Sequence, residues 1–99
     1  MTSRLTLGNI VLDQTTFELS SPHGSFRLAN KEYQMMELLM RSGGRRICAE
    51  EIARRVWGEE KAGSELIWVH ISSLRGKLDK IGAKAKICTY RGQGYVLEV

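Results

Sequence analysis

The spacing of hydrophobic residues changes twice along this 99-residue chain, and these changes limit the folds that it can adopt. In the first 28 residues the apolar residues form short runs separated by turn-forming residues, which predicts antiparallel strands at 5–7, 10–12, 16–19 and 25–28. Apolar residues then recur every three or four positions, which is helical spacing. Extended runs return near the C-terminus. This order predicts an α+β fold.

Three helices are expected in the middle of the chain, at residues 31–42, 49–57 and 64–81, each followed by glycine. The third has the clearest stripe, because its apolar residues recur at steps of four, three and four and define one buried face: Ile67, Ile71, Leu74 and Leu78. Two extended runs, 86–90 and 95–99, flank the tetrapeptide Arg91-Gly92-Gln93-Gly94. This arrangement predicts a β-hairpin with Arg91 at its tip.

The distribution of charge favours an anionic partner. The chain is 42% hydrophobic and 26% charged, as in an ordinary globular domain, and its net charge is +4. Residues 65–95 carry six basic and two acidic side chains, so the whole excess lies in the last third of the chain. A basic stripe of this kind indicates a polyanion such as a nucleic acid.

Other classes of protein fit the sequence less well. No apolar run approaches the ~20 residues needed to span a bilayer, and no secretory signal is recognisable, so we expect a cytoplasmic protein without a membrane partner. Cys48 and Cys88 lack zinc-ligand spacing and are expected to be reduced, mostly buried thiols. No nucleophile, base and orienting residue stand at a plausible spacing. We therefore expect neither an enzyme nor bound cofactors or metals.

The face of the third helix opposite its buried stripe carries small and polar residues, including Val69, Ser72 and Ser73. A helix fits the major groove of B-DNA, where hydroxyl groups reach base edges and a valine can contact a thymine methyl group. The alternative is an ordinary solvated face. The hairpin favours the first interpretation, because an arginine at a glycine-rich tip can enter a narrow minor groove. A helix beside such a hairpin is typical of a winged helix-turn-helix.

Four motifs in order along the chain support this interpretation: Leu28-x-x-Lys31-Glu32-Tyr33, Val56-Trp57-Gly58, Val69-His70-Ile71-x-x-Leu74-Arg75-x-Lys77-Leu78 and Thr89-x-Arg91-Gly92-x-Gly94-Tyr95. Together they resemble the OmpR/PhoB-type winged-helix effector domain of bacterial two-component response regulators. The length of the chain predicts one domain over residues 1–99, and the resemblance covers about residues 5–98. It implies an N-terminal four-stranded sheet at 5–28, a three-helix core at 30–81 and a wing hairpin at 86–98. It implies promoter DNA binding under phosphorelay control, with the receiver domain absent from this chain.

The resemblance also implies which residues contact DNA. From the recognition helix we expect contacts by Leu66, Val69, His70, Ser72, Ser73, Arg75 and Lys77. From the wing and its surroundings we expect phosphate contacts by Thr89, Tyr95 and Trp57, with Arg91 in the minor groove. The loop between the second and third helices, including Glu59, Glu60 and Lys61, corresponds to a segment that contacts RNA polymerase in some members. Such domains bind DNA as homodimers, and we expect a monomer in its absence.

The sequence departs from the family pattern at several positions. Ser72 and Ser73 stand where related recognition helices often carry arginine, which predicts fewer phosphate and guanine contacts, and a binding site read through thymine methyl groups and DNA shape. Ala29 replaces the usual threonine cap, so Asn30 is expected to cap the first helix one residue later. Trp68 is expected to pack under the preceding loop, the alternative being an exposed aromatic that contacts a partner. The missing arginines leave open a winged-helix module that binds protein instead of DNA.

Overall fold

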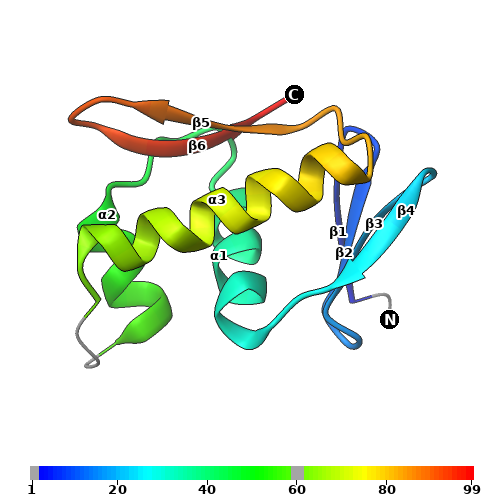
Figure 1. Cartoon of the computed structure of the whole chain (residues 1–99), viewed down its shortest axis with the longest axis horizontal. Coiled ribbons are helices and arrows are strands. Elements are labelled where there is room, and N and C mark those ends of the chain that lie inside the picture. The colour runs from blue at the N-terminus through cyan, green and yellow to red at the C-terminus, as the bar shows by residue number, and fades with distance from the viewer. Residues whose placement is uncertain (1–2, 59–61) are drawn as a thin grey trace.

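The computed structural model describes residues 3–58 and 62–99 (Figure 1). Within these ranges the elements are β1 (Arg4–Leu7), β2 (Ile10–Asp13), β3 (Glu18–Ser21), β4 (Gly24–Arg27), α1 (Asn30–Arg41), α2 (Ala49–Ile52), the π-helical turn η1 (Ala53–Trp57), α3 (Ser64–Lys80), β5 (Lys86–Tyr90) and β6 (Gly94–Glu98). The predicted α+β winged helix-turn-helix is confirmed. Figure 1 shows α3 running beneath the β5–β6 hairpin, with α2 near one end of α3 and the β1–β4 sheet near the other.

The N-terminal sheet is antiparallel, with its strands in the order β1-β2-β3-β4. Its third strand begins two residues later than the predicted 16–19, because Phe17 adopts a left-handed conformation (φ 65°) and ends the preceding turn. The Asp13 carboxylate closes that turn by accepting the N–H groups of Thr15 and Thr16 at 2.8 and 3.1 Å. The Phe17 ring stacks on Tyr33 of α1 at 4.1 Å between centroids. The turn therefore attaches the sheet to the helical core.

The helical core forms around the predicted stripe of α3, whose four residues are at most 1% exposed. On α1, Met35, Met36 and Leu39 pack against the same core. The first helix does not begin one residue late as expected. It begins at Asn30, and the side chain of Glu32 accepts the N–H of Ala29 at 3.4 Å, so Asn30 is not the cap. Among the described residues, no helix is long and apolar enough to cross a membrane.

The second helix is not the single α-helix expected over 49–57. It changes from α2 to the wider η1 turn at Ala53, and the N–H of Gly58 reaches the carbonyls of both Ala53 and Arg54 at 3.1 Å. Gly58 ends the segment with φ 63°.

The expectation of mostly buried thiols was wrong for Cys48, which is exposed just before α2, whereas Cys88 is half-buried.

The hairpin is held to the helical core by a short third-strand contact. Ile47 and Tyr95 exchange backbone hydrogen bonds at 2.8 and 2.9 Å. Gly94 allows this approach, because its φ is 111° and a Cβ atom there would collide with the carbonyl of Ile47. Glycine at this position therefore serves the attachment of the wing as well as its turn.

Candidate nucleic-acid interface

The outward side of α3 is the first part of the candidate interface. Leu66 is 39% exposed and Val69 is 50% exposed. Ser73 is exposed and Ser72 is half-buried beside them. We call these four residues the outer face of α3. The expected placement of Trp68 was wrong, because its side chain is 55% exposed beside the outer face. The N-terminal half of α3 therefore presents three apolar side chains to solvent, next to the exposed Ser64 and Glu65 of its first turn.

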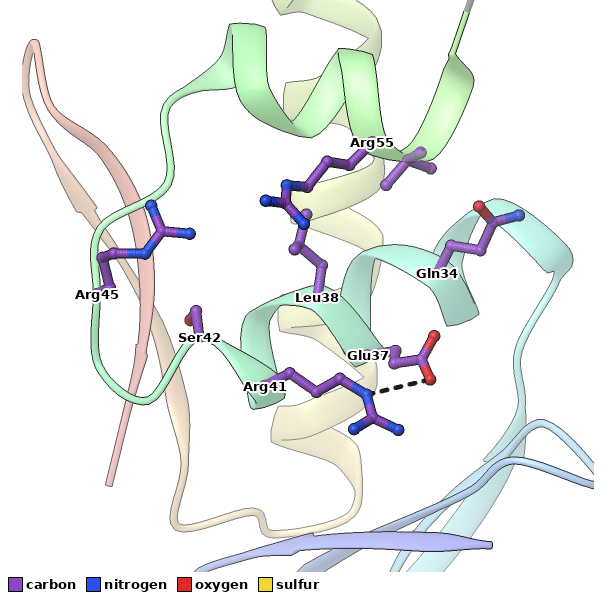
Figure 2. Close-up of a pocket in the computed structure, with 8 residues that line it drawn as sticks. Gln34, Glu37, Leu38, Arg41, Ser42, Arg45 and Arg55 are labelled. Atoms are coloured by element: carbon purple, nitrogen blue, oxygen red, sulfur yellow. Dashed lines mark hydrogen bonds and ion pairs between the residues drawn. The ribbon is translucent and has the colours of Figure 1, made fainter.

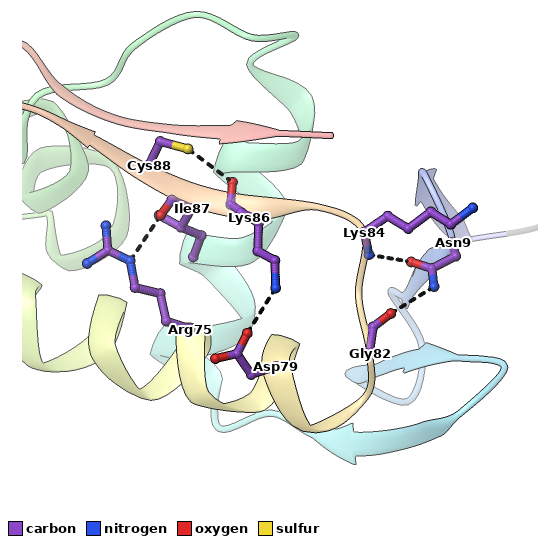
Figure 3. Close-up of polar contacts among 8 residues, drawn as sticks. All are labelled: Asn9, Arg75, Asp79, Gly82, Lys84, Lys86, Ile87 and Cys88. Carbon is purple, nitrogen blue, oxygen red and sulfur yellow. Dashed lines mark hydrogen bonds and ion pairs between the residues drawn. The ribbon is translucent and has the colours of Figure 1, made fainter.

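Arg75 lies where α3 meets the wing. Its Nε donates to the carbonyl of Ile87 at 3.0 Å (Figure 3). Its Nη2 donates to the hydroxyl of Thr89 at 2.5 Å. Two of the predicted contact residues, Arg75 and Thr89, are thus brought together. Their mutual bond means that the guanidinium fixes the position of β5 relative to α3, and only its remaining N–H groups are left for an external anion.

A buried ion pair joins α3 to α1. Glu32 is 8% exposed, and its carboxylate accepts from the ammonium of Lys77 at 2.6 and 2.8 Å and from the hydroxyl of Ser73 at 2.5 Å. Burial by itself would raise the pKa of Glu32, but the hydrogen bonds from Lys77 and Ser73 outweigh it and lower the pKa. Lys77 and Ser73 are therefore held by Glu32, a residue of the first motif whose role in orienting α3 the sequence did not indicate.

His70 of α3 and Trp57 of η1 form a second contact between elements. The Nδ1–H of His70 donates to the carbonyl of Leu66 at 2.9 Å, since a carbonyl oxygen can only accept, and this directs Nε2 away from the helix backbone. The Trp57 ring meets His70 edge to face at 5.1 Å and is 7% exposed. The structure therefore places Trp57 beneath His70, with little of its surface open to a phosphate.

The predicted contacts of the wing differ in their exposure. Arg91 and Gly92 are exposed at the hairpin tip, whereas Tyr95 is half-buried against the core. The predicted polymerase-contact residues Glu59, Glu60 and Lys61 lie outside the described residues.

The basic side chains of residues 65–95 are less available to an external anion than the sequence indicates. Besides Arg75 and Lys77, Lys86 is paired with Asp79 at 2.9 Å, with both side chains largely exposed (Figure 3). The other three basic residues, Lys80, Lys84 and Arg91, are exposed and make no side-chain hydrogen bond or ion pair with the described residues. Half of the predicted basic stripe therefore serves contacts within the chain.

Sequence reasoning missed Arg46. Its guanidinium lies over the Tyr90 ring at 3.8 Å from the centroid and donates to the side chain of Gln93, so a third cation stands beside the hairpin. The only local signal is the basic pair Arg45-Arg46 before a buried isoleucine, and it does not indicate which arginine turns toward the wing.

A separate pocket of about 340 Å³ lies between α1 and η1, lined by Gln34, Glu37, Leu38, Arg41, Ser42, Arg45, Arg55 and Val56 (Figure 2). Arg41 pairs with Glu37 across one turn of α1 at 3.4 Å. Helical spacing places these residues on the opposite side of α1 from Glu32, which faces α3. The pocket is therefore not part of the candidate interface.

The chain is similar to a family model, to curated proteins and to solved structures. The family model described as "Transcriptional regulatory protein, C terminal" matches residues 23–97. The heme response regulator HssR of Staphylococcus aureus is 37% identical over 97 residues, which are 97% of this chain and 43% of the relative, so the chain spans less than half the length of the curated relatives that it matches.

Solved structures share the fold. The DNA-binding domain of Escherichia coli CadC superimposes with a TM-score of 0.87 at 18% identity, covering 100% of this chain and 95% of that one. The DNA-binding domain of the response regulator AdeR, solved in complex with an intercistronic region, superimposes with a TM-score of 0.82 at 22% identity, covering 94% and 97%. At these identities the likeness is one of fold.

Proposed function

Because this chain belongs to the family of C-terminal domains of transcriptional regulatory proteins, we propose that it is the DNA-binding output domain of a response regulator and that it binds promoter DNA sequence-specifically. The observation that carries the proposal is the pairing of an exposed helix face with an exposed basic tip. The outer face of α3 lies beside a hairpin whose tip presents Arg91, and Arg75 fixes the two elements together.

In the proposed complex α3 enters the major groove. Leu66 and Val69 contact base edges, and the hydroxyl of Ser72 donates to a base or phosphate at the rim. Ser73 and His70 also lie at the rim, where the Ser73 hydroxyl oxygen and the Nε2 of His70 accept from base edges, because their N–H and O–H groups already donate within the chain. Arg75 and Lys77 act mainly by holding α3 against the wing and α1, because their charged groups already have partners within the chain. Direct reading therefore favours thymine methyl groups over guanine, whose usual reader is a free arginine or lysine.

The wing and the basic residues around it supply the second part of the contact. Arg91 enters the minor groove, which is most electronegative where it is narrow. Thr89 and Tyr95 lie beside the adjoining phosphates, and Trp57 supports His70 from beneath.

The proposed function also implies partners other than DNA. A receiver domain precedes this segment in the full-length protein, and phosphorylation there controls assembly of a homodimer on DNA from monomers. The loop that contains Glu59, Glu60 and Lys61 contacts RNA polymerase. A promoter-binding domain of this kind acts in the cytoplasm, and its function is binding without catalysis.

A second candidate function is a winged-helix module that binds another protein. The specific observation in its favour is that Leu66, Trp68 and Val69 are all exposed on one half of α3, since clustered exposed apolar side chains mark protein interfaces as well as groove contacts. In that case the same face of α3 would be covered by a protein and no duplex would bind specifically.

Selection from a pool of random duplexes separates the two functions. A DNA-binding domain enriches a defined sequence, and His70→Ala and Arg91→Ala each weaken binding to it by ~1–3 kcal/mol while the chain stays folded at the assay temperature. Val99→Ala is the control, because Val99 is 71% exposed at the C-terminus, outside the candidate interface. DNA binding would be refuted if the pool yields no enriched sequence. It would also be refuted if the affinities of both variants for random duplexes equal the affinity of Val99→Ala.

A further inference from the structure

Arg46 lies in a segment that is attached directly to the wing. The next residue, Ile47, exchanges two backbone hydrogen bonds with Tyr95 of β6. The backbone at Arg46 is therefore held at the edge of the hairpin, although 47 positions separate it from Gln93, the wing residue that its side chain contacts.

The Arg46 side chain is fixed by two wing residues. Its guanidinium stacks over the Tyr90 ring at 3.8 Å, and its Nη1 donates to the side-chain oxygen of Gln93. Tyr90 is anchored in turn, because its hydroxyl donates to the carboxylate of Glu98 at 2.6 Å. A stacked guanidinium keeps its charge and its planar set of N–H donors, and its position costs little further side-chain entropy on binding.

The stack lies on the side of the hairpin that faces away from α3. Successive side chains of a strand point to opposite faces, and Thr89 faces α3 through its bond to Arg75. Tyr90, and with it Arg46, therefore occupies the other face. Arg91 stands at the tip between the two faces, so guanidinium groups lie on the inner side, at the end and on the outer side of one hairpin.

We propose that Arg46 is a DNA-contacting residue of the wing, binding a backbone phosphate on the strand across the minor groove from the one that faces α3. This inference rests on the proposed function. A hairpin that enters the minor groove has a strand of phosphates on each side, and Arg46 supplies the cation on the side that α3 does not reach. Its guanidinium contacts the Tyr90 side chain and a neutral amide, and it also lowers the pKa of the nearby Glu98 carboxylate, after the larger effect of the hydrogen bonds from Tyr90 and Cys88. A guanidinium has five N–H donors, so donors remain for a phosphate.

The neighbouring Arg45 provides a matched control. It has the same charge and an exposed side chain, but both of its terminal nitrogens donate to the Glu51 carboxylate, at 3.2 and 3.0 Å. That carboxylate, which belongs to α2, balances its charge. Neutralising Arg45 and neutralising Arg46 therefore change the net charge equally, but only the second removes a cation from the wing.

The test measures how the affinity of the chain for its selected duplex depends on salt. Each phosphate contact contributes about 0.9 to the slope of log affinity against log salt concentration. We expect Arg46→Gln to reduce that slope by about one unit and to weaken binding about three- to tenfold at 100 mM salt. Arg46→Lys keeps the slope, because it keeps the charge, and Arg45→Gln leaves both quantities at the wild-type values.

The outcomes separate the inference from the function on which it rests. If the wild-type chain selects no duplex, the proposed function fails. If it selects one and Arg46→Gln keeps the wild-type slope, or changes it no more than Arg45→Gln, Arg46 only braces the wing and the inference is overturned. Thermal melting of each variant identifies loss of folding, and Arg46→Met, which is also neutral and can still pack on the Tyr90 ring, carries the test if Arg46→Gln does not fold: a wild-type slope in this variant would also overturn the inference.

Discussion

The buried ion pair between Glu32 and Lys77 should be worth far more to this fold than the surface pairs. The Glu32 side chain is 10% exposed and the Lys77 side chain is 24% exposed. Removing one partner of a fully buried pair costs about 3–5 kcal/mol, whereas an exposed pair is worth about 0–1 kcal/mol. Because Lys77 retains some contact with water, we expect Glu32→Gln to lower the free energy of unfolding by about 2 kcal/mol.

This loss is large enough to measure by thermal melting. In a domain of this size, ~1 kcal/mol corresponds to a change of about 4–8 °C in Tm, so Glu32→Gln should lower Tm by about 8–16 °C. Asp79→Asn is the control, since it removes the acidic partner of the exposed Lys86 and should cost less than about 0.5 kcal/mol. Replacing both partners, as Glu32→Leu with Lys77→Met, should recover most of the loss, because no unpaired charge then remains buried.

The ion pair of Glu32 with Lys77 also makes the free energy of unfolding depend on pH. The pKa of Glu32 is lowered in the folded chain from its ordinary value of 4.5, despite burial, by hydrogen bonds from Lys77 and Ser73. The unfolded chain therefore binds more protons as the pH falls through this range. The advantage of the wild type over Glu32→Gln should be complete above pH 4.5 and should shrink as the pH falls below it. Equal costs for Glu32→Gln and Asp79→Asn, or a pH-independent difference, would refute the reasoning.

Three further predictions concern the wing and the outer face. Gly94→Ala should lower the free energy of unfolding by ~2 kcal/mol or more, because its φ is 111° and the Cβ would meet the Ile47 carbonyl; a Tm equal to that of the wild type would contradict this account. Replacing thymine by deoxyuridine in the selected duplex should weaken binding about fourfold for each methyl group contacted, at ~0.8 kcal/mol per buried group. That sensitivity should fall in Val69→Ala, and equal sensitivity in this variant would argue against the assignment. Trp68→Ser should change stability by less than about 0.5 kcal/mol, because the side chain is 55% exposed, whereas a loss of several kcal/mol in urea unfolding would indicate a buried ring.

The sequence by itself determined the order of elements and the buried stripe of α3. Both depend on interactions between residues close together in the chain: hydrophobic spacing chooses helix or strand, and glycines mark where each element ends. Ile67, Ile71, Leu74 and Leu78 are buried as their spacing predicts. The shift of β3 was missed, because no local pattern indicates that Phe17 turns to stack on Tyr33 of α1.

The tertiary structure decided which charged groups remain available. Glu32 meets Lys77 across 45 positions of sequence, and Arg46 meets Gln93 across 47. Helical spacing gives the direction of a side chain from its own axis, but it does not give the neighbour that packs there. For this reason the sequence predicted a basic stripe and a recognition helix, whereas only the packing of α1, α3 and the hairpin showed that Arg75 and Lys77 are held within the chain and that Arg46 joins the wing.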